Sequence, residues 1–306
     1  QPFAVNIPLY NKRAAEFLDI AEAERVPILI ASQGGPKPHL PRFRAIGTKW
    51  VHVVASPQHA AKAEAAGVDA LIAVGGEAGG HPAPEEVAAM VLVRAVLRSV
   101  RIPVIGAGGM ADGAGIAAMF ALGADGAQLG TRFLMTREAT VHDAYKQAVL
   151  AAGIADTRLV GRGRLPVRQV RNAFSDAVDA AERSAMPEEE RVALIASRSL
   201  KDAALDGDVD WGKVEAGETA GLIDDLPAAE CAVAEVPRVG DNAVSRWRRT
   251  GRRIKCNGLR GSRRVGSNRE ARRRRVRQEG ARHGPIRRAD HRKGYGDRVD
   301  LLAVLD

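Results

Sequence analysis

The sequence has few cysteines and no long apolar run. Its two cysteines, Cys231 and Cys256, form no CxxC motif, which argues against a disulfide scaffold and fits a reducing compartment. No apolar run reaches the roughly 18 to 20 residues that a membrane-spanning helix needs, since Arg94 interrupts even the run VAAMVLVRAVL. We therefore expect a cytoplasmic protein without a membrane-spanning segment.

Motifs of metal-dependent and covalent catalysis are also missing. The sequence contains no GxSxG motif, and neither cysteine has glycine-rich or cationic neighbours within residues 1–236 that would indicate a nucleophile. Four histidines lack the HxH or i, i+4 spacing of a metal site, namely His39, His52, His59 and His142. We expect neither a metal ion nor a covalent intermediate on the protein.

The net charge of +9 is unevenly distributed. Residues 237–306 contain 22 Lys and Arg against 7 Asp and Glu, whereas residues 1–236 contain 24 against 30. In the basic segment 20 of the 22 cations are Arg, and no RGG repeat occurs. Translation of a GC-rich message out of frame explains this bias better than an RNA-binding arm does. We expect an Arg-rich tail over residues 237–306, disordered or frameshift-derived, and nucleic-acid binding through it is the last alternative function.

Short apolar runs recur through the first part of the chain and predict strands. Each is followed by a helical segment, and their starts lie roughly 20 to 33 residues apart, as expected for βα units that build a parallel sheet. The runs are FAVNI from residue 3, ILIA from 28, WVHVV from 50, ALIAV from 70, PVIGA from 103 and GAQLG from 126.

Six such units, in a chain that opens within a strand, are most simply interpreted as a (βα)₈ barrel that lacks its first two units. An open doubly wound sheet is the alternative. The strand signal stops at about residue 137. The expected domains are therefore a truncated barrel over residues 1–136, a helical second domain over residues 137–236, and the tail.

Glycine turns follow the last two predicted strands, in PVIGAGGMADG (103–113) and GAQLGTRF (126–133). The first satisfies a relaxed GxGxxA pattern, but a Rossmann site also needs an acidic residue at the end of the next strand, where this chain has Gln128, Leu129 and Gly130. Two such turns in succession match the phosphate site that the loops after strands 7 and 8 of a barrel commonly form. They favour an anion site over two purely structural turns.

His81 lies in the stretch LIAVGGEAGGHPAP (71–84), directly after a predicted strand. Its position is at the carboxyl end of the sheet, where barrel active sites gather, and imidazole exchanges protons near neutral pH. A histidine with a purely structural role is the alternative. Because no apolar periodicity surrounds it, His81 is the candidate catalytic residue.

Five segments resemble, in this order, the nitronate monooxygenase (2-nitropropane dioxygenase-like) family, whose relatives include FMN-dependent enoyl-ACP reductases. The resemblance covers about residues 1–236 and implies a barrel with FMN at the carboxyl ends of its strands, covered by a helical second domain. The segments are VNIPLYN, GVDALIAVGGEAGGHPAP, IPVIGAGGMADGAGIAAMFALGADGAQLGTRFLMT, VRQVRNAF and EAGETAGLIDDLPAA.

The resemblance also implies roles for individual residues. His81 matches the family's active-site histidine, which takes the α-proton from a neutral nitroalkane or holds the nitronate. The expected cofactor-binding residues are Gly108, Gly109, Gly130 and Thr131 at the FMN phosphate, Ala107 and Gly79 lining the cofactor, and Asn6 reaching the flavin. Two residues depart from the family pattern, namely Ala83 in place of a glycine and Glu218 in place of a common glutamine.

The implied activity is the FMN-dependent oxidation of alkyl nitronates by O₂, which yields a carbonyl compound and nitrite. An NAD(P)H-dependent FMN reductase of enoyl thioesters or quinones is the alternative that the same motifs support. A flavin-free barrel that binds a phosphorylated substrate is a further alternative, based on the glycine turns alone.

Overall fold

The computed structural model describes residues 3–163 and 165–234. All of them belong to one compact unit. The Arg-rich segment predicted to form a tail over residues 237–306 lies outside the described residues.

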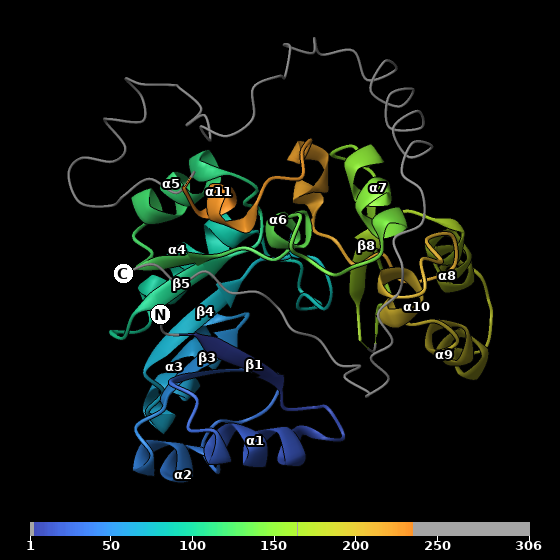
Figure 1. Cartoon of the computed structure of the whole chain (residues 1–306). Helices are drawn as coiled ribbons and strands as arrows, with labels where there is room; N and C mark the ends of the chain where they lie inside the picture. The colour runs from blue at the N-terminus through green and yellow to red at the C-terminus, as the bar shows by residue number, and fades with distance from the viewer. Residues whose placement is uncertain (1–2, 164, 235–306) are drawn as a thin grey trace. The chain divides into compact units, whose positions relative to one another are not determined.

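Six parallel strands form one sheet, and they neighbour one another in the order in which they occur along the chain (Figure 1). A doubly wound sheet reverses its strand order at a switch point, so this order excludes that alternative and gives a curled, barrel-like sheet. All six predicted strands are confirmed: β1 (Ala4–Pro8), β2 (Ile28–Ser32), β3 (Lys49–Val54), β4 (Ala70–Val74), β5 (Val104–Ala107) and β6 (Gly126–Gln128).

Both faces of this sheet are apolar, which is why its strands read as continuous apolar runs. The inner face carries a cluster that includes Ile30, Val51, Ile72 and Ile105. The outer face packs against helices that follow the strands, and together they bury a larger core. These helices are α1 (Ala14–Ala23), α2 (Leu40–Ala45), α3 (Pro57–Ala66), α4 (Ala89–Leu97) and α5 (Gly113–Leu122).

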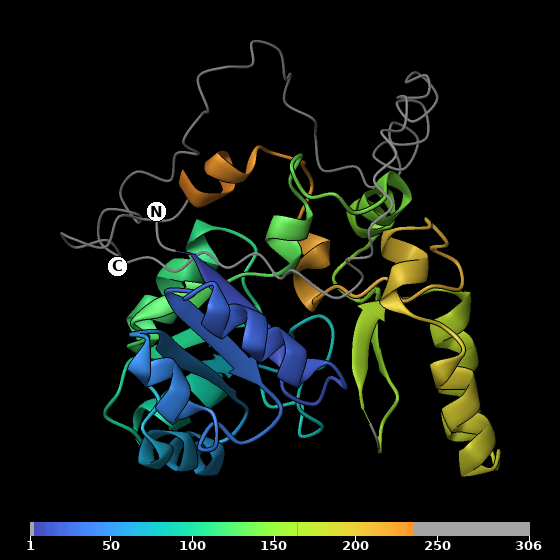
Figure 2. The same cartoon turned by 60° about the horizontal axis from the view of Figure 1, so that its bottom comes forward.

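The region after residue 137, where the strand signal was predicted to stop, contains a β-hairpin, so that prediction was wrong. Strands β7 (Thr157–Val160) and β8 (Val167–Val170) pair antiparallel (Figure 2). Each strand has an arginine at its second position, and these cations interrupt the apolar pattern that marks the other strands. The remaining elements are α6 (Thr131–Leu134), α7 (Asp143–Ala151), α8 (Ala173–Arg183), α9 (Glu188–Ala196), α10 (Leu200–Ala204), η1 (Glu218–Leu222) and α11 (Ala229–Ala234).

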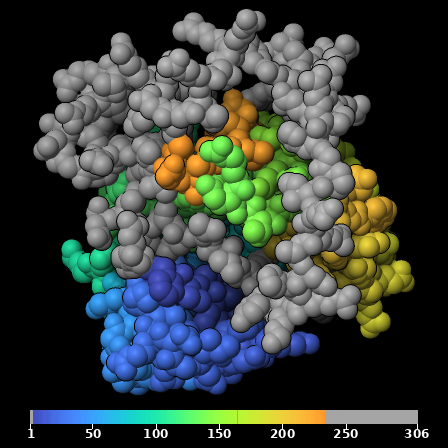
Figure 3. Space-filling view, viewed as in Figure 1, coloured from blue at the N-terminus to red at the C-terminus, as the bar shows by residue number. Residues whose placement is uncertain are grey.

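The last elements of the described chain, η1 and α11, come back to the sheet beside α6. Helix α6 directly follows β6 and contacts both η1 and α11, seen as green beside orange in the space-filling view (Figure 3). The buried guanidinium of Arg132 in α6 donates to the carboxylate of Asp225 at 2.9 Å. Segments more than 80 residues apart in sequence therefore meet beside the carboxyl end of β6.

The two faces of the hairpin contact different parts of the molecule. Arg158 is paired with Gln169, and Val160 with Val167, so these residues share one face. Val160 packs with Phe174 and Val178, which places α8 on that face. Arg168 belongs to the opposite face, because side chains alternate along a strand.

Candidate functional site

All the predicted site residues except Asn6 lie at the carboxyl ends of neighbouring strands. His81 and Gly79 belong to the connection between β4 and α4, residues 75–88, which we call the histidine loop. Ala107 is the last residue of β5, with Gly108 and Gly109 directly after it. Gly130 and Thr131 follow β6. Parallel neighbouring strands end at the same edge of a sheet, so the structure brings these segments to one edge.

Asn6 lies farther from this edge, in the middle of β1. Its register partner on β2 is Ile30, a member of the inner cluster, to which Ala4 also belongs. Side chains alternate along a strand, so Asn6 is on the inner face with Ala4. Ala107 is in the same cluster, at the carboxyl end of β5. Both residues therefore lie on the face of the sheet that a barrel encloses.

The histidine loop is closely packed rather than open. The carboxylate of Glu77 accepts hydrogen bonds of 2.9 and 3.1 Å from the N–H of Ala89, the first residue of α4. A Cβ atom on Gly76 would come within 2.7 Å of the backbone of Glu86, and one on Gly79 within 2.6 Å of the backbone of Ala216. The glycines of this loop thus allow close contact between backbone segments, and for Gly79 this packing alone requires a glycine.

The hairpin pairs with the middle of the histidine loop as an added strand would. The N–H of Gly80 donates to the carbonyl of Arg168 at 3.0 Å, and the N–H of Arg168 donates back to the carbonyl of Gly80 at 2.7 Å. On another side, the N–H of Glu218 donates to the carbonyl of Glu77 at 3.0 Å. Both neighbours come from the part of the chain after residue 137.

The orientation of His81 follows from its contact with the hairpin. Nδ1 of His81 lies 2.9 Å from the carbonyl oxygen of Pro166. A carbonyl only accepts, so Nδ1 carries the proton and Nε2 of the neutral ring is the acceptor. The ring of Tyr10, from the loop after β1, meets His81 edge-on at a centroid distance of 6.4 Å. The arrangement presents a half-buried imidazole whose Nε2 can accept a proton.

The glycine turns offer unused backbone donors. Gly108 and Gly109 have φ angles of +89° and +74°, values that favour glycine. Within the described part of the chain, the backbone N–H groups of Gly108, Gly109, Gly130 and Thr131 donate no hydrogen bond. The hydroxyl of Thr131 accepts from the N–H of Gly217 at 3.0 Å, which leaves its own proton to donate. Such a group of donors suits an anion.

Sequence reasoning missed Arg168 and Pro166. The guanidinium of Arg168 is buried beside the histidine loop, where Nε donates to the carbonyl of Gly76 at 2.8 Å and Nη1 pairs with Glu218 at 3.0 Å. The sequence shows VRQV only as a short polar-apolar segment, and nothing in it indicates which residue its arginine meets. Gln128 is a further residue at this edge, in register with Ala107.

Among the described residues, His52 has a strongly shifted pKa and lies away from the site. Burial lowers the pKa of His52 in β3 to about 4, and a hydrogen bond with the backbone of Gly34 opposes the shift. Nε1 of the buried Trp50 lies 3.5 Å from its Nδ1. His52 is therefore neutral at physiological pH and forms part of the packing of β3.

Neither a metal site nor a membrane-spanning helix occurs among the described residues. No group of three or more His, Cys, Asp or Glu side chains in residues 3–163 and 165–234 could hold a metal ion. Over the same residues, no helix has both the length and the apolar character required to cross a membrane.

Comparisons with known proteins identify the family. The model of the nitronate monooxygenase family matches residues 4–236. The chain is 37% identical over 216 residues to a nitronate monooxygenase of Paraburkholderia phytofirmans, a match that covers 67% of this chain and 58% of that protein. It therefore spans less than two thirds of that relative.

Solved structures are similar as well. The structure of FabK from Thermotoga maritima has a TM-score of 0.75 and 38% identity, covering 81% of this chain and 78% of that one. A nitroalkane oxidase from Streptomyces ansochromogenes has a TM-score of 0.62 and 29% identity, covering 77% and 81%. From the extent of the family match, the chain belongs to the nitronate monooxygenase family, a family of oxidoreductases.

Proposed function

We propose that this chain carries an FMN-dependent site that oxidises alkyl nitronates with O₂, with His81 as its catalytic residue. The observation that carries the proposal is the 2.9 Å contact between Nδ1 of His81 and the carbonyl of Pro166, which makes Nε2 the proton acceptor. This nitrogen belongs to a loop at the same sheet edge as the unused donors after β5 and β6.

The residues present fit FMN at this edge. The N–H groups of Gly108, Gly109, Gly130 and Thr131 would hold its phosphate, and a Cβ on Gly130 would meet no atom within 4 Å, so there is room beside it. Ala107 and Gly79 would line the cofactor, and Asn6 would reach it from the inner face of β1. A bound FMN would supply the redox chemistry, namely electron transfer from the substrate to O₂.

The protein's part in the reaction is proton transfer and orientation. With a neutral nitroalkane, Nε2 of His81 takes the proton from the carbon next to the nitro group, and the resulting imidazolium holds the nitronate by a charge-assisted hydrogen bond. With a nitronate as substrate no proton is removed, and His81 only binds the anion. The overall reaction consumes the nitronate and O₂ and releases a carbonyl compound and nitrite.

Two further βα units between β6 and β1 would complete the barrel. Among the described strands, β1 and β6 each have one neighbour and do not pair with each other. Such unpaired edges are usually covered or closed in native proteins. A complete barrel of eight strands would enclose the inner face on which Asn6 and Ala107 lie.

A second candidate function has its own support. The 38% identity to FabK, an enoyl-ACP reductase, is as high as that to the nitronate monooxygenase relative. An NAD(P)H-dependent FMN reductase of enoyl thioesters or quinones would use the same phosphate donors. The two functions differ in which compound reduces the flavin.

Anaerobic reduction of the flavin distinguishes the two functions. The full chain is purified, mixed with FMN, and its visible spectrum is recorded after addition of propyl-2-nitronate or of NADH. Bleaching by the nitronate, followed by nitrite release when O₂ is admitted, is the expected result. Bleaching by NADH alone would select the reductase, and failure to bind FMN would contradict both functions.

The role of His81 has its own test. In His81→Asn, turnover of neutral nitroethane should fall by about 10²- to 10⁴-fold, the usual contribution of a general base, while turnover of ethyl nitronate should change far less. The matched control is His59→Asn, since His59 is exposed on α3, and it should behave as wild type. An equal loss on both substrates would remove the base role.

A further inference from the structure

We propose that Arg168 is a positioning residue, which fixes the histidine loop against the β7–β8 hairpin and thereby sets the orientation and tautomer of His81. This inference rests on the proposed role of His81. It adds Arg168, a residue outside the loop, as one whose side chain the role of His81 requires.

The first support is the set of contacts of the Arg168 side chain. Nε donates to the carbonyl of Gly76 at 2.8 Å, at the start of the histidine loop. Nη1 pairs with Glu218 at 3.0 Å, and Nη2 lies 3.8 Å from the carboxylate of Glu86, near the end of the loop. One guanidinium thus contacts both ends of the segment that carries His81.

The second support comes from the backbone around Arg168. Its N–H and carbonyl both bond to Gly80, the residue before His81, at 2.7 and 3.0 Å. Two residues earlier, the carbonyl of Pro166 accepts from Nδ1 of His81. A shift of the hairpin relative to the loop would therefore break the contact that places the proton on Nδ1.

The contacts at residue 168 require the guanidinium of an arginine. The side chain is 8% exposed, so its charge must be balanced by partners in the protein. A guanidinium has a rigid fork of donors that can bind Gly76 and Glu218 at once, whereas a lysine ammonium is a single point charge. Because residue 218 is a glutamate, its contact with Arg168 is an ion pair.

The loop also contains a conformation that requires support. Glu86 has a φ angle of +50°, which costs a residue with a Cβ atom about 1 to 2 kcal/mol. Its carboxylate lies between the guanidinium groups of Arg162, at 3.2 Å, and Arg168. Contacts with the hairpin thus help to hold this end of the loop.

The test uses two substitutions of Arg168 and a matched control. Arg168→Met removes the donors and the charge, while Arg168→Lys keeps the charge and loses the donation from Nε to Gly76. The control, Arg158→Met, removes the arginine on the other face of the same hairpin, whose ion pairs within the described residues are with Asp176 and Asp179 of α8. All are made in the full chain.

Two readouts do not depend on activity. Nitrogen-15 NMR of histidine-labelled protein reports the tautomer of His81, assigned by its absence in His81→Asn. Hydrogen exchange of the peptide that contains Gly80 reports the hairpin contact, relative to peptides of β4 and β5. In Arg168→Met we expect a mixed tautomer and about tenfold or more faster exchange of this peptide, with an intermediate effect in Arg168→Lys and none in Arg158→Met.

Kinetics complete the test. Misplacement of a catalytic group by about 1 Å can cost on the order of 10²-fold in rate, so kcat with nitroethane should fall in Arg168→Met with little change in KM. A wild-type tautomer and wild-type exchange in both Arg168 variants would overturn the proposal, as would the same changes in Arg158→Met. Inactivity of the wild-type chain on nitronate would contradict the proposed function alone, because the NMR and exchange results do not need turnover.

Discussion

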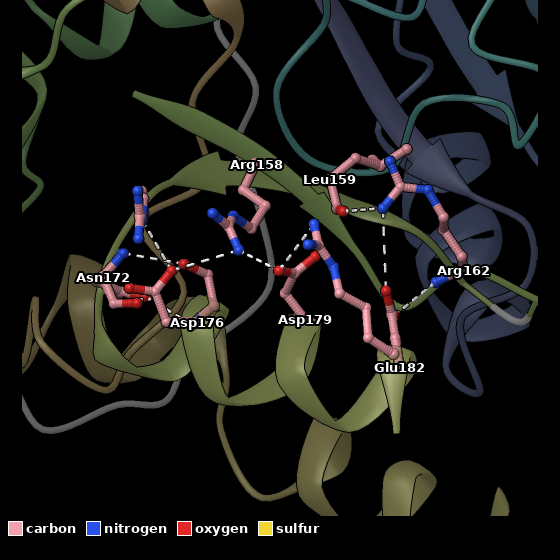
Figure 4. Close-up of polar contacts among 10 residues, drawn as sticks. Arg158, Leu159, Arg162, Asn172, Asp176, Asp179 and Glu182 are labelled. Atoms are coloured by element: carbon pink, nitrogen blue, oxygen red, sulfur yellow. Dashed lines mark hydrogen bonds and ion pairs between the residues drawn. The ribbon is translucent and has the colours of Figure 1, made fainter. Parts of the chain in front are cut away.

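The two faces of the β7–β8 hairpin each present one arginine, and the surroundings of these arginines differ. Arg158 pairs with Asp176 and Asp179 on α8 (Figure 4), and its side chain is 23% exposed. Arg168 is 8% exposed, and its partners belong to the histidine loop and η1. A helix keeps its form through its own hydrogen bonds, whereas a loop takes its form from its contacts. On one face an arginine therefore joins two regular elements, and on the other face an arginine contacts the histidine loop.

The α8 face also shares its charges among several partners. Asp176, Asp179 and Glu182 follow one another at intervals of three residues and face β7 and the hairpin turn (Figure 4). Asp176 also pairs with Arg171 at 2.8 Å, and Asp179 with Arg183 at 3.2 Å. If one arginine is removed, Asp176 and Asp179 each keep a second arginine as partner. The face of the hairpin against α8 should therefore tolerate substitution better than the face against the histidine loop.

Truncation of each arginine gives the largest expected difference between the faces. Arg168→Ala leaves a cavity and an unpaired buried carbonyl at Gly76, so we expect a loss of about 3 to 5 kcal/mol in the free energy of unfolding. Arg158→Ala should cost about 1 kcal/mol, as is usual for a partly exposed ion pair. Urea unfolding monitored by circular dichroism measures both values. Equal losses would show that the two faces contribute alike to stability.

A pH series compares the hairpin with the six-stranded sheet, because the buried His52 of β3 titrates in the acidic range. Burial holds the pKa of His52 at about 4 in the folded protein, against about 6.5 when it is unfolded. The unfolded state therefore binds the extra proton below pH 6.5, and stability falls by about 3 kcal/mol between pH 7 and pH 4. His52→Gln should flatten this dependence over that range. If the pH dependence were unchanged in His52→Gln, the loss of stability at low pH would not come from His52.

The six parallel strands could be predicted because burial on both faces makes each strand a continuous apolar run, such as ALIAV or WVHVV. The hairpin could not, because each strand carries an arginine, the half-buried Arg158 or the buried Arg168, whose counter-charges come from elsewhere in the chain. A residue pattern reports the polarity of a side chain but not the partner that makes its burial possible.

The candidate site shows the same limit. The edge that carries His81 and the glycine turns follows from strand order, since parallel strands end together. The partner of His81 does not, because Pro166 is 85 residues away in sequence and reaches the ring only through the fold of the hairpin. Gly79 could be read as lining a cofactor, but its close contact with Ala216 became visible only in three dimensions.

Gly79→Ala tests whether packing positions the histidine loop independently of the ion pairs. The added Cβ would lie 2.6 Å from the backbone of Ala216, so the loop or the segment beside it must move. We expect a loss of about 1 to 3 kcal/mol in the free energy of unfolding, typical of overpacking, with faster exchange of the Gly80 amide. The control is Gly130→Ala, where nothing lies within 4 Å, and its stability should stay within about 0.5 kcal/mol of wild type.

The smallest expected effect belongs to Arg162, the residue that connects the two faces. Its Nε lies 3.2 Å from Glu86 of the histidine loop, and its backbone N–H donates to Glu182 of α8 at 3.0 Å. The side chain is 51% exposed, so Arg162→Gln should change the free energy of unfolding by no more than about 0.5 kcal/mol and leave the exchange of Gly80 as in wild type. Arg162→Gln could instead give the mixed His81 tautomer that we expect of Arg168→Met. The charges on the two faces of the hairpin would then form one coupled network. In that case the different burial of Arg158 and Arg168 would not explain their different roles.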